Sequence, residues 1–510
     1  MNREFPTQAD VVIVGSGPAG AAYARILSEQ SPDANVVMFE VGPLLADPPG
    51  IHVKNLPGDA RARAQRLSEG PAPRDGASTD TMKGYADASQ RLVRPGTFLL
   101  PDGYRMPGED GLPGAAMSSN VGGMGAHWTG ACPRPGGKER VDFIDDLDEL
   151  LSEGERLLGV DDRVFEGAPY SAQVRERLAE LLDSERPANR HVAPMPLAVR
   201  RQQDGGLVWS GSDVVFGEPT RSNPRFTLIP EALVARVRHE HGQVTGVIVR
   251  DQRDCTEHTV DAPVVVVAAD ALRTPQILWA SNVRPHALGR WLNDQPQSVY
   301  AVRLRDVESH ADVDHDSTEI VPESGVNWVP YTDDDPFHGQ VMQLDASPVK
   351  LASDDAPKPG TIVGLGWFCA KDLQESDRVE FDDAQLDGYG MPAMRIHYRL
   401  TDDDHSMIQR SRQAMMRAAA ALGEPLDDRD PLTFAPGASL HYQGTVRMGQ
   451  VDDGTSVCGP TSEVWGVAGL FVAGNGVIPT AIACNPTLTS VALAVHGARS
   501  IAANITSTKG

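Results

Sequence analysis

A glycine-rich turn near the start of the chain constrains its fold more than any other feature. Residues 11–14 are apolar and β-branched, which is typical of a strand buried on both faces of a parallel sheet. The turn that follows, residues 15–20, reads Gly-Ser-Gly-Pro-Ala-Gly and opens an alanine-rich segment with apolar residues at helical spacing. A second apolar run, residues 36–39, ends at Glu40. The sequence therefore predicts a βαβ unit whose first turn fits the pattern G-x-G-x-x-G.

The three glycines of this turn have different expected roles. Gly15 makes the tight turn, Gly17 lets the backbone approach a pyrophosphate, and Gly20 allows close packing of the helix. The N-terminus of the helix supplies amide donors and a positive dipole to phosphates. Glu40 follows the second apolar run, a position from which its carboxylate can accept hydrogen bonds from ribose hydroxyls. We predict a dinucleotide site, and the motif alone does not separate FAD from NAD.

Length and charge limit the classes of function. The 510 residues exceed what one hydrophobic core organises, so we expect two domains. The net charge of −24 repels nucleic acid and anionic membranes, and neither is an expected partner. Five scattered cysteines with no C-x-x-C pair indicate neither a disulfide framework nor a zinc site, and we expect no metal. No run reaches the ~18 apolar residues of a membrane span, and we expect a cytoplasmic protein.

Apolar runs far along the chain predict how the domains are divided. Residues 264–267 and 470–474 have the character of buried parallel strands and predict a return to the N-terminal sheet. We predict an α/β fold with a Rossmann-like cofactor domain and a second, α+β substrate domain built on an antiparallel or mixed sheet. The predicted cofactor domain comprises residues 1–150, 225–295 and 440–510, and the substrate domain residues 151–224 and 296–439. A discontinuous domain that wraps one extended cofactor favours FAD.

Other segments have weaker patterns. Residues 225–228, 233–238 and 244–250 predict a meander of strands with Gly242 and Gly246 at its turn. Helices are expected over 174–182, 404–422 and 487–505, whereas 41–100 and 187–230 are expected to be irregular.

Several motifs together resemble a known family, the glucose-methanol-choline (GMC) oxidoreductases. Besides residues 11–20 they are Val121–Thr129, Leu288–Pro296, Asp387–Pro392, His441-x-x-Gly444-Thr445 and Gly474–Thr489. The His127-Trp128-Thr129 and Asn485–Thr489 segments are similar to the pyranose oxidase branch, and the short chain is similar to bacterial members that oxidise glycosides, including C-glycosides, at C3. The resemblance implies oxidation of a secondary sugar hydroxyl to a ketone, at C3 in preference to C2, with molecular oxygen reduced to hydrogen peroxide.

A histidine and an asparagine are the candidate catalytic residues. Removing a hydride from an alcohol carbon requires that the hydroxyl proton leave, and a neutral imidazole can accept it. We predict that His441 is this base. Asn485 is its expected partner, which orients the hydroxyl and stabilises charge developing on its oxygen.

The resemblance also implies a set of cofactor contacts. Besides the N-terminal turn they are Gly122, Gly123, Met124, His127, Trp128, Thr129, Val234, Gly474, Asn475, Pro486 and Thr487. His127 matches the position at which fungal relatives tether the flavin through its 8α-methyl group, but Gly125-Ala126 replace the Ser-Thr that precedes that histidine. We expect a non-covalent FAD, with a bond through His127 as the alternative.

Residues 325–339 resemble the mobile substrate loop of the family. They carry Trp328, Tyr331 and Phe337, which are expected to stack on a sugar face or an aglycone, with packing inside the loop as the alternative. Two other functions stay open: a sugar dehydrogenase that uses a quinone or another acceptor, and a flavin-binding protein without turnover. The sequence does not indicate the oligomeric state.

Overall fold

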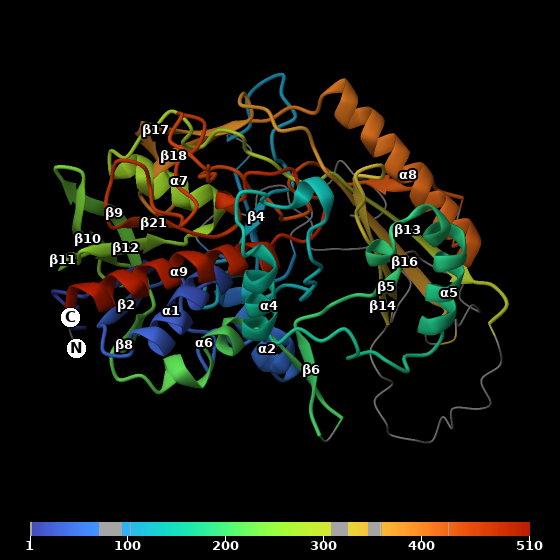
Figure 1. Cartoon of the computed structure of the whole chain (residues 1–510), viewed down its shortest axis with the longest axis horizontal. Helices are drawn as coiled ribbons and strands as arrows, with labels where there is room; N and C mark the ends of the chain where they lie inside the picture. Colours follow the sequence, from blue (N-terminus) through green and yellow to red (C-terminus); the bar gives the residue numbers. More distant parts are fainter. Residues whose placement is uncertain are drawn as a thin grey trace.

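A parallel sheet and a larger antiparallel sheet dominate the described part of the chain (Figure 1). The computed structural model describes residues 3–70, 94–101, 104–203, 205–307, 325–344, 358, 360–426 and 428–509. The parallel sheet lies on the left in Figure 1, behind the long helix α9, and the antiparallel sheet lies on the right with helices α5 and α8. Residues 71–93 of the segment expected to be irregular lie outside the described residues.

The parallel sheet begins with the predicted βαβ unit. Its strand order is β21-β12-β1-β2-β8 among the described residues, and every neighbouring pair is parallel. The strands are β1 (Val11–Val14), β2 (Val36–Phe39), β8 (Phe226–Ile229), β12 (Val264–Val267) and β21 (Leu470–Val472). Segments from both ends of the chain and from its middle therefore build one sheet.

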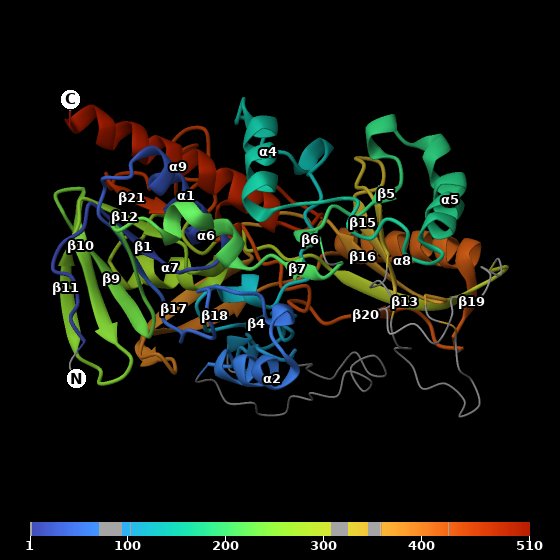
Figure 2. The same cartoon turned by 90° about the horizontal axis from the view of Figure 1, so that it is seen from below.

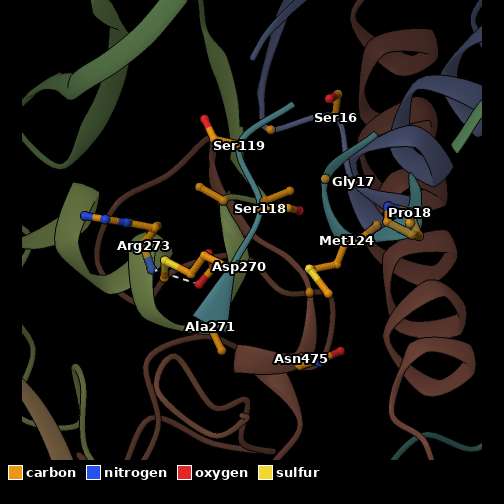
Figure 3. A pocket seen from close by; sticks show the side chains of 18 of the residues that line it. Ser16, Gly17, Pro18, Ser118, Ser119, Met124, Asp270, Ala271, Arg273 and Asn475 are labelled. Atoms are coloured by element: carbon orange, nitrogen blue, oxygen red, sulfur yellow. Dashed lines mark hydrogen bonds between the residues drawn. The ribbon is translucent and has the colours of Figure 1, made fainter. Parts of the chain in front are cut away.

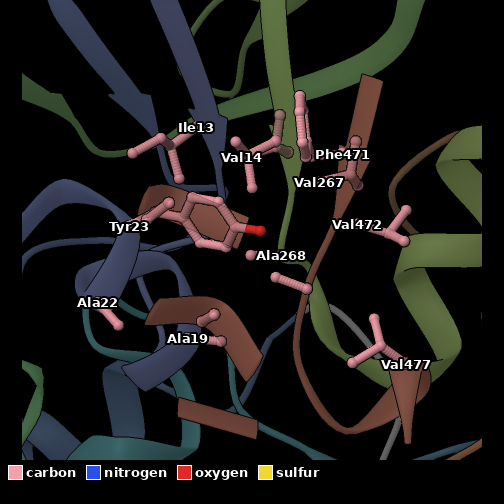
Figure 4. Close-up of a cluster of buried hydrophobic side chains, with 14 of the residues drawn as sticks. Ile13, Val14, Ala19, Ala22, Tyr23, Val267, Ala268, Phe471, Val472 and Val477 are labelled. Carbon is pink, nitrogen blue, oxygen red and sulfur yellow. The ribbon is translucent and has the colours of Figure 1, made fainter. Parts of the chain in front are cut away.

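Helices cover this sheet and bury its strands. Helix α1 (Pro18–Gln30) packs along α9 (Thr487–Lys509), and α6 (Ser212–Arg221) packs against α1. Figure 4 shows Ile13 and Val14 of β1 next to Tyr23 of α1 and side chains of β12 and β21. All four residues of β1 are buried, which is why the run contains no polar residue.

A separate antiparallel sheet lies beside the parallel one. It contains β9 (Ala232–Glu240), β10 (Gln243–Asp251) and β11 (Glu257–Asp261) in the order β11-β10-β9. The prediction that 225–228 belongs to this meander was wrong, because β8 instead pairs with β2 at the edge of the parallel sheet. Gly242 does lie in the turn between β9 and β10, but Gly246 lies within β10, where the register shifts.

The larger antiparallel sheet forms the other side of the molecule. Its order is β19-β13-β16-β15-β14-β5, with β20 also paired to β13. The strands are β5 (Ala193–Pro194), β13 (Gln297–Leu304), β14 (Val326–Val329), β15 (Phe337–Gln343), β16 (Ile362–Cys369), β19 (Gly423–Pro425) and β20 (Leu432–Thr433). Helix α8 (Asp402–Leu422) packs on β13 and β16, and α5 (Ser171–Leu182) packs on α8 (Figure 2). Residues 325–339, expected to be a loop, begin and end in strands of this sheet.

Two segments expected to be irregular contain regular elements. Residues 41–100 include α2 (Gly58–Leu67), and residues 187–230 include β6 (Val199–Arg201), β7 (Leu207–Trp209) and α6. Helix α6 was missed because Gly217 and Pro219 interrupt its pattern, and the backbone at Gly217 is indeed non-helical. The remaining α-helices and strands of the described residues are β3 (Phe98–Leu99), β4 (Ala116–Met117), α4 (Leu147–Leu158), α7 (Asp270–Ala280), β17 (Arg378–Leu386) and β18 (Pro392–His397).

The α/β architecture confirms the predicted fold class, whereas the domain boundaries stay a prediction. Helix α4 spans the predicted boundary at residue 150 and packs on α9, and α6 packs on α1 although it falls in a range expected to join the substrate domain. Within the ranges that the structure describes, every helix is too short or too polar to cross a bilayer.

Candidate active site

A cavity of about 330 Å³ lies beside the carboxyl ends of the parallel strands. Such ends are the usual ligand site of an open parallel sheet, because the loops that leave them surround a common space. Figure 3 shows Ser16, Gly17 and Pro18 of the β1–α1 turn, Ser118, Ser119 and Met124, the start of α7 and Asn475 around this space. The far wall includes His441 and Asn485. One cavity therefore joins the dinucleotide turn to the predicted catalytic pair.

The geometry of the turn fits the roles predicted for its three glycines. Gly15 has a φ of +99°, and a Cβ atom there would overlap the carbonyl oxygen of Ala268. A Cβ atom on Gly20 would overlap the carbonyl oxygen of Gly15, so the helix can approach the turn only without a side chain. Gly17 lines the cavity, and a Cβ atom there would have no neighbour within 4 Å. Gly17 thus leaves open the space that a pyrophosphate would take.

Glu40 is buried at the end of β2 and holds the turn in place. Its Oε2 accepts hydrogen bonds from the backbone N–H of Ser16 at 3.0 Å and from Ser16 Oγ at 2.7 Å, and its Oε1 accepts from Gly42 N at 3.0 Å. Burial raises the pKa of Glu40, while these hydrogen bonds act to lower it. The backbone N–H of Gly122 donates to Ser16 Oγ at 2.9 Å, which anchors the 120s segment to the same turn. A contact of Glu40 with a ribose stays a prediction.

Most predicted cofactor residues line this cavity, and three do not. Those in the wall are Gly15, Gly17, Glu40, Gly123, Met124, His127, Trp128, Thr129, Val234, Gly474, Asn475 and Thr487. Gly20 serves helix packing, Gly122 lies behind the wall with a φ of +99°, and Pro486 precedes α9, where its carbonyl accepts from Ser490 N. These three residues have supporting positions rather than places in the cavity wall.

His127 lies in the cavity wall with one unpaired nitrogen. Its Nε2 is 3.0 Å from Ser68 Oγ and 3.3 Å from Asn120 Oδ1, whereas its buried Nδ1 has no hydrogen-bond partner among the described residues. Burial lowers the pKa of His127 to about 4, so the ring is neutral near pH 7. A buried unpaired nitrogen is uncommon in a folded protein and fits a site that receives a ligand. The arrangement leaves the covalent and the non-covalent alternative open.

Trp128 and Asn475 are fixed by hydrogen bonds at the cavity. The indole N–H of Trp128 donates to the carbonyl of Ser210 at 2.7 Å, and Asn475 Oδ1 accepts from Ser490 Oγ at 2.5 Å. Asn475 is thereby tied to α9, whose first residue, Thr487, also lines the cavity. The positive end of the α9 dipole lies at this wall, where it would stabilise negative charge on a bound group.

His441 is held by a buried glutamine. His441 Nδ1 lies 2.7 Å from Gln295 Oε1, and Gln295 Nε2 donates to the backbone carbonyls of Ile482 and Cys484, each at 2.8 Å. Because both amide protons are used by carbonyl oxygens, the oxygen of Gln295 faces the imidazole. Nδ1 of His441 then carries the proton, and Nε2 presents its lone pair.

Asn485 completes the pair from the other side. Its Nδ2 lies 3.3 Å from His441 Nε2, and its Oδ1 accepts from Gln340 Nε2 at 2.7 Å. His338 Nδ1 accepts from the indole N–H of Trp328 at 2.8 Å. Trp328 can only donate, so neutral His338 keeps its proton on Nε2, which donates it to Asn485 and not to Gln340 Nε2, itself a donor 3.3 Å away. The amide of Asn485 is thus oriented with Nδ2 toward His441.

Both histidines of this network are neutral near pH 7. Burial lowers the pKa of His441 to about 3, and the positive charge of Arg94 adds to the effect. Burial likewise lowers the pKa of His338 to about 3, with a further contribution from His441, whereas Asn485 opposes the shift by a hydrogen bond. An imidazole that is neutral and has a fixed tautomer is suited to accept a proton.

The three aromatic residues expected to contact substrate lie elsewhere. Trp328, Tyr331 and Phe337 are 9%, 3% and 2% exposed, and none of them belongs to the cavity wall. Trp328 packs in a cluster with Met195 and Trp209, and Phe337 packs against the core beneath α8. The burial of these side chains in a paired segment favours the alternative, packing, while a contact with the sugar stays an untested prediction.

Sequence reasoning missed Gln295, His338 and Gln340. All three are buried polar residues, and burying a polar side chain costs free energy unless it is hydrogen-bonded. Alternation in β15 was an available signal, since His338 and Gln340 are two residues apart and face the same side of the sheet. Gln295 lies in the Leu288–Pro296 motif, which carried no assigned role.

The wall fits a flavin dinucleotide. It offers the helix α1 N-terminus, the open space at Gly17 and the buried Nδ1 of His127, which has no partner among the described residues. Among the described residues, no cluster of three or more His, Cys, Asp or Glu side chains could hold a metal ion.

Comparison with known proteins identifies the family. Residues 202–297 and 375–494 match the two models of the GMC oxidoreductases. The chain is 63% identical over 509 residues to the C-glycoside 3-oxidase of Microbacterium trichothecenolyticum, an alignment that covers 99% of this chain and 98% of the relative. The chain belongs to the GMC oxidoreductase family. The predicted family is confirmed.

Other proteins are similar to this chain as well. The chain is 61% identical to the C-glycoside 3-oxidase of Arthrobacter globiformis, over 99% of this chain and 96% of the relative. It is 34% identical to the pyranose 2-oxidase of Tricholoma matsutake, over 98% of this chain and 94% of the relative. The solved structure of pyridoxine 4-oxidase from Mesorbium loti superimposes with a TM-score of 0.65 at 19% identity, covering 97% of this chain and 99% of that one. This last likeness concerns the fold alone.

Proposed function

We propose that this GMC oxidoreductase is an FAD-dependent oxidase of pyranoses or glycosides, including C-glycosides. It oxidises a secondary hydroxyl, at C3 in preference to C2, to a ketone and reduces molecular oxygen to hydrogen peroxide. The observation that carries the proposal is the hydrogen-bonded pair of His441 and Asn485 in the cavity that also contains the dinucleotide turn. The C3 preference is supported by the 63% and 61% identity to two C-glycoside 3-oxidases.

The cofactor would be held along the cavity from the turn to α9. The N-terminus of α1 and Gly17 would hold the pyrophosphate, and Val234 would contact the adenine through its backbone. Met124, Trp128 and Thr129 would lie against the flavin. FAD, when bound, supplies the acceptor for the hydride and passes two electrons to oxygen.

His441 would take the proton of the substrate hydroxyl at Nε2. This nitrogen presents a lone pair because Gln295 keeps the ring proton on Nδ1, and the substrate hydroxyl would take the place of the Asn485 Nδ2 donor that lies 3.3 Å away. As the proton leaves, the carbon–oxygen bond gains double-bond character and the hydride departs from the same carbon. The substrate loses two electrons and two hydrogens in total, and one oxygen molecule gains them as hydrogen peroxide.

Asn485 would hold the same oxygen in place. Its Nδ2, which lies 3.3 Å from His441 Nε2, would donate to the hydroxyl oxygen and stabilise the negative charge that develops on it. Since an amide does not titrate, the pair contains a single base.

A substrate screen tests this function. The purified protein is incubated in air with free pyranoses, O-glycosides and C-glycosides, and peroxide is quantified while NMR locates the ketone in the product. We expect peroxide and a 3-keto product. Dye reduction without peroxide would indicate a dehydrogenase that uses another acceptor. Failure of every sugar to bleach the flavin without oxygen would indicate a flavin-binding protein without turnover.

Acid precipitation tests how the flavin is attached. We expect a yellow supernatant from the native protein, because the serine and threonine that precede the tethering histidine in fungal relatives are absent here. A yellow pellet that becomes colourless in His127→Ala would instead establish the bond through His127.

A further inference from the structure

Gln295 contacts His441 through its side-chain oxygen and, through its amide donors, the backbone of the segment that precedes Asn485. We propose that Gln295 is a positioning residue that fixes the tautomer of His441 and the place of the segment that leads into Asn485. The inference rests on the proposed function, because it assigns a role toward the same proton transfer. It also gives a role to the Leu288–Pro296 motif.

Strand register brings Gln295 to His441. Asn293 and Gln443 form an antiparallel bridge, with backbone hydrogen bonds of 2.9 and 3.0 Å in both directions. In antiparallel register, the residue two positions after Asn293 lies opposite the residue two positions before Gln443. These residues are Gln295 and His441, whose side chains meet at 2.7 Å.

The segment 482–485 is held from two directions. Gln295 donates to the carbonyls of Ile482 and Cys484, while the buried Glu139 accepts from Ala483 N at 2.8 Å and from Cys484 N at 2.9 Å. A donor and an acceptor therefore hold successive peptide groups just before Asn485. Because one glutamine also holds the imidazole, the distance between the two catalytic side chains depends on it.

Two substitutions of Gln295 separate its acceptor toward His441 from its donors toward Ile482 and Cys484. Gln295→Leu removes both, and we expect kcat to fall about 100-fold, as for a small misplacement of reacting groups. Gln295→Glu keeps an acceptor toward His441 Nδ1 but loses both donors and adds a negative charge. The pH at which kcat/KM falls to half on the acid side should then rise by about 1 to 3 pH units, because the negative charge stabilises the protonated imidazole. The other titratable or charged groups near His441, which are Arg94, His338 and Asp294, are unchanged in both variants.

Gln443→Leu is the matched control. Gln443 is a buried glutamine of the same bridge, and neither atom of its side-chain amide has a hydrogen-bond partner among the described residues. We expect kcat and the pH profile of this variant to stay within twofold of the native values. A uniform loss in both Gln295 and Gln443 variants would mean that any change in this bridge is harmful, and it would overturn the proposal.

A second readout does not depend on turnover. With ¹⁵N-labelled histidine, the imidazole nitrogen signals of the flavin-loaded protein distinguish a protonated from a bare nitrogen, and His441→Ala identifies the signals of His441. We expect a protonated Nδ1 and a bare Nε2 in the native protein, and loss of this single tautomer in Gln295→Leu.

The outcomes are decisive in each case. A protonated Nε2 in the native protein, or native kcat in Gln295→Leu, overturns the proposal. If Gln295→Leu does not fold, the pH profile of Gln295→Glu and the native NMR spectrum decide. If no sugar is oxidised, the proposed function fails, whereas the tautomer measurement still tests the role of Gln295.

Discussion

The two ends of the cavity are built from different parts of the chain. At the dinucleotide end the wall includes residues 15–19, and the shape of this turn depends on the absence of side chains at Gly15 and Gly20. At the reaction end the wall includes the side chains of His441 and Asn485, which are held from behind by Gln295 and Gln340 of distant segments. The first end needs a local conformation, whereas the second needs several strands and loops in register.

This difference determines how each end can fail. A change at the dinucleotide end should affect binding of the cofactor or stability. A change at the reaction end should affect the rate and leave the cofactor bound. The following predictions test this division, from the largest expected effect to the smallest.

Replacing His441 by Ala should lower kcat by about 1000-fold, because the hydroxyl proton loses its acceptor. Bound FAD should be retained, since the ring contacts Gln295 and Asn485 rather than the dinucleotide turn. Peroxide release gives kcat, and the absorbance ratio of flavin to protein gives occupancy. Loss of the flavin together with activity would contradict the division.

Replacing Asn485 by Ala should lower kcat about 100-fold, because one donor to the developing oxygen charge is removed while the base remains. Stopped-flow measurement of flavin bleaching without oxygen isolates this step from reoxidation. An unchanged bleaching rate would rule out the proposed role of Asn485.

Two glycine variants test the dinucleotide end. Gly17→Ala should fold normally, because a Cβ atom there has no neighbour within 4 Å, yet it should weaken FAD binding by about tenfold through overlap with the pyrophosphate. Gly15→Ala should instead lower the free energy of unfolding by about 2 kcal/mol or more, because of its φ of +99° and its overlap with Ala268. Flavin titration and urea unfolding measure the two effects. Equal behaviour of both variants would show that the turn has no separate binding role.

Replacing Trp328 by Phe should lower kcat by only about threefold to tenfold. The change removes the donor to His338 and so allows the other tautomer of that ring, which weakens the orientation of Asn485. Trp367→Phe is the control, because Trp367 is buried in the same sheet and its indole nitrogen has no partner among the described residues. If both variants lose the same activity, the effect comes from packing.

The pH profile of the native enzyme should be nearly flat between about pH 5 and 8. Burial lowers the pKa of His441 to about 3, so the imidazole stays neutral in this range and accepts the proton equally well. Below about pH 5, protonation of the ring should reduce kcat/KM as the pH approaches that pKa. A midpoint near 6.5 for kcat/KM would show that the ring titrates as if exposed.

The sequence predicted the fold of the dinucleotide end well because each of its requirements is local. A strand, three glycines, a helix and an acid all lie between Val11 and Glu40, and every one of them can be recognised without knowing the rest of the fold. A feature that depends on pairing with another strand was predicted wrongly. Gly246 was assigned to a turn, but it lies at a register shift inside β10.

The reaction end was predicted only in part. His441 and Asn485 were predicted through resemblance, whereas Gln295 and Gln340 reach them through strand pairings that no local pattern indicates. Trp328 was expected to meet the substrate, but the sheet buries it, and its connection to the pair runs through His338. Which side of a strand faces a cavity depends on the sheet around it.

The strand order of the parallel sheet determines when the cavity can form during synthesis. Strand β1 is made first, but its neighbour β12 begins only at Val264, and β21 and α9 begin at Leu470 and Thr487. Until that final part has left the ribosome, β12 has an open edge, α1 lacks the helix that packs along it, and Asn485 is absent. Folding of the parallel sheet and of the cavity therefore depends on the synthesis of β21 and α9. A chain released before Leu470 would leave the apolar edge of β12 unpaired, and such an edge promotes aggregation.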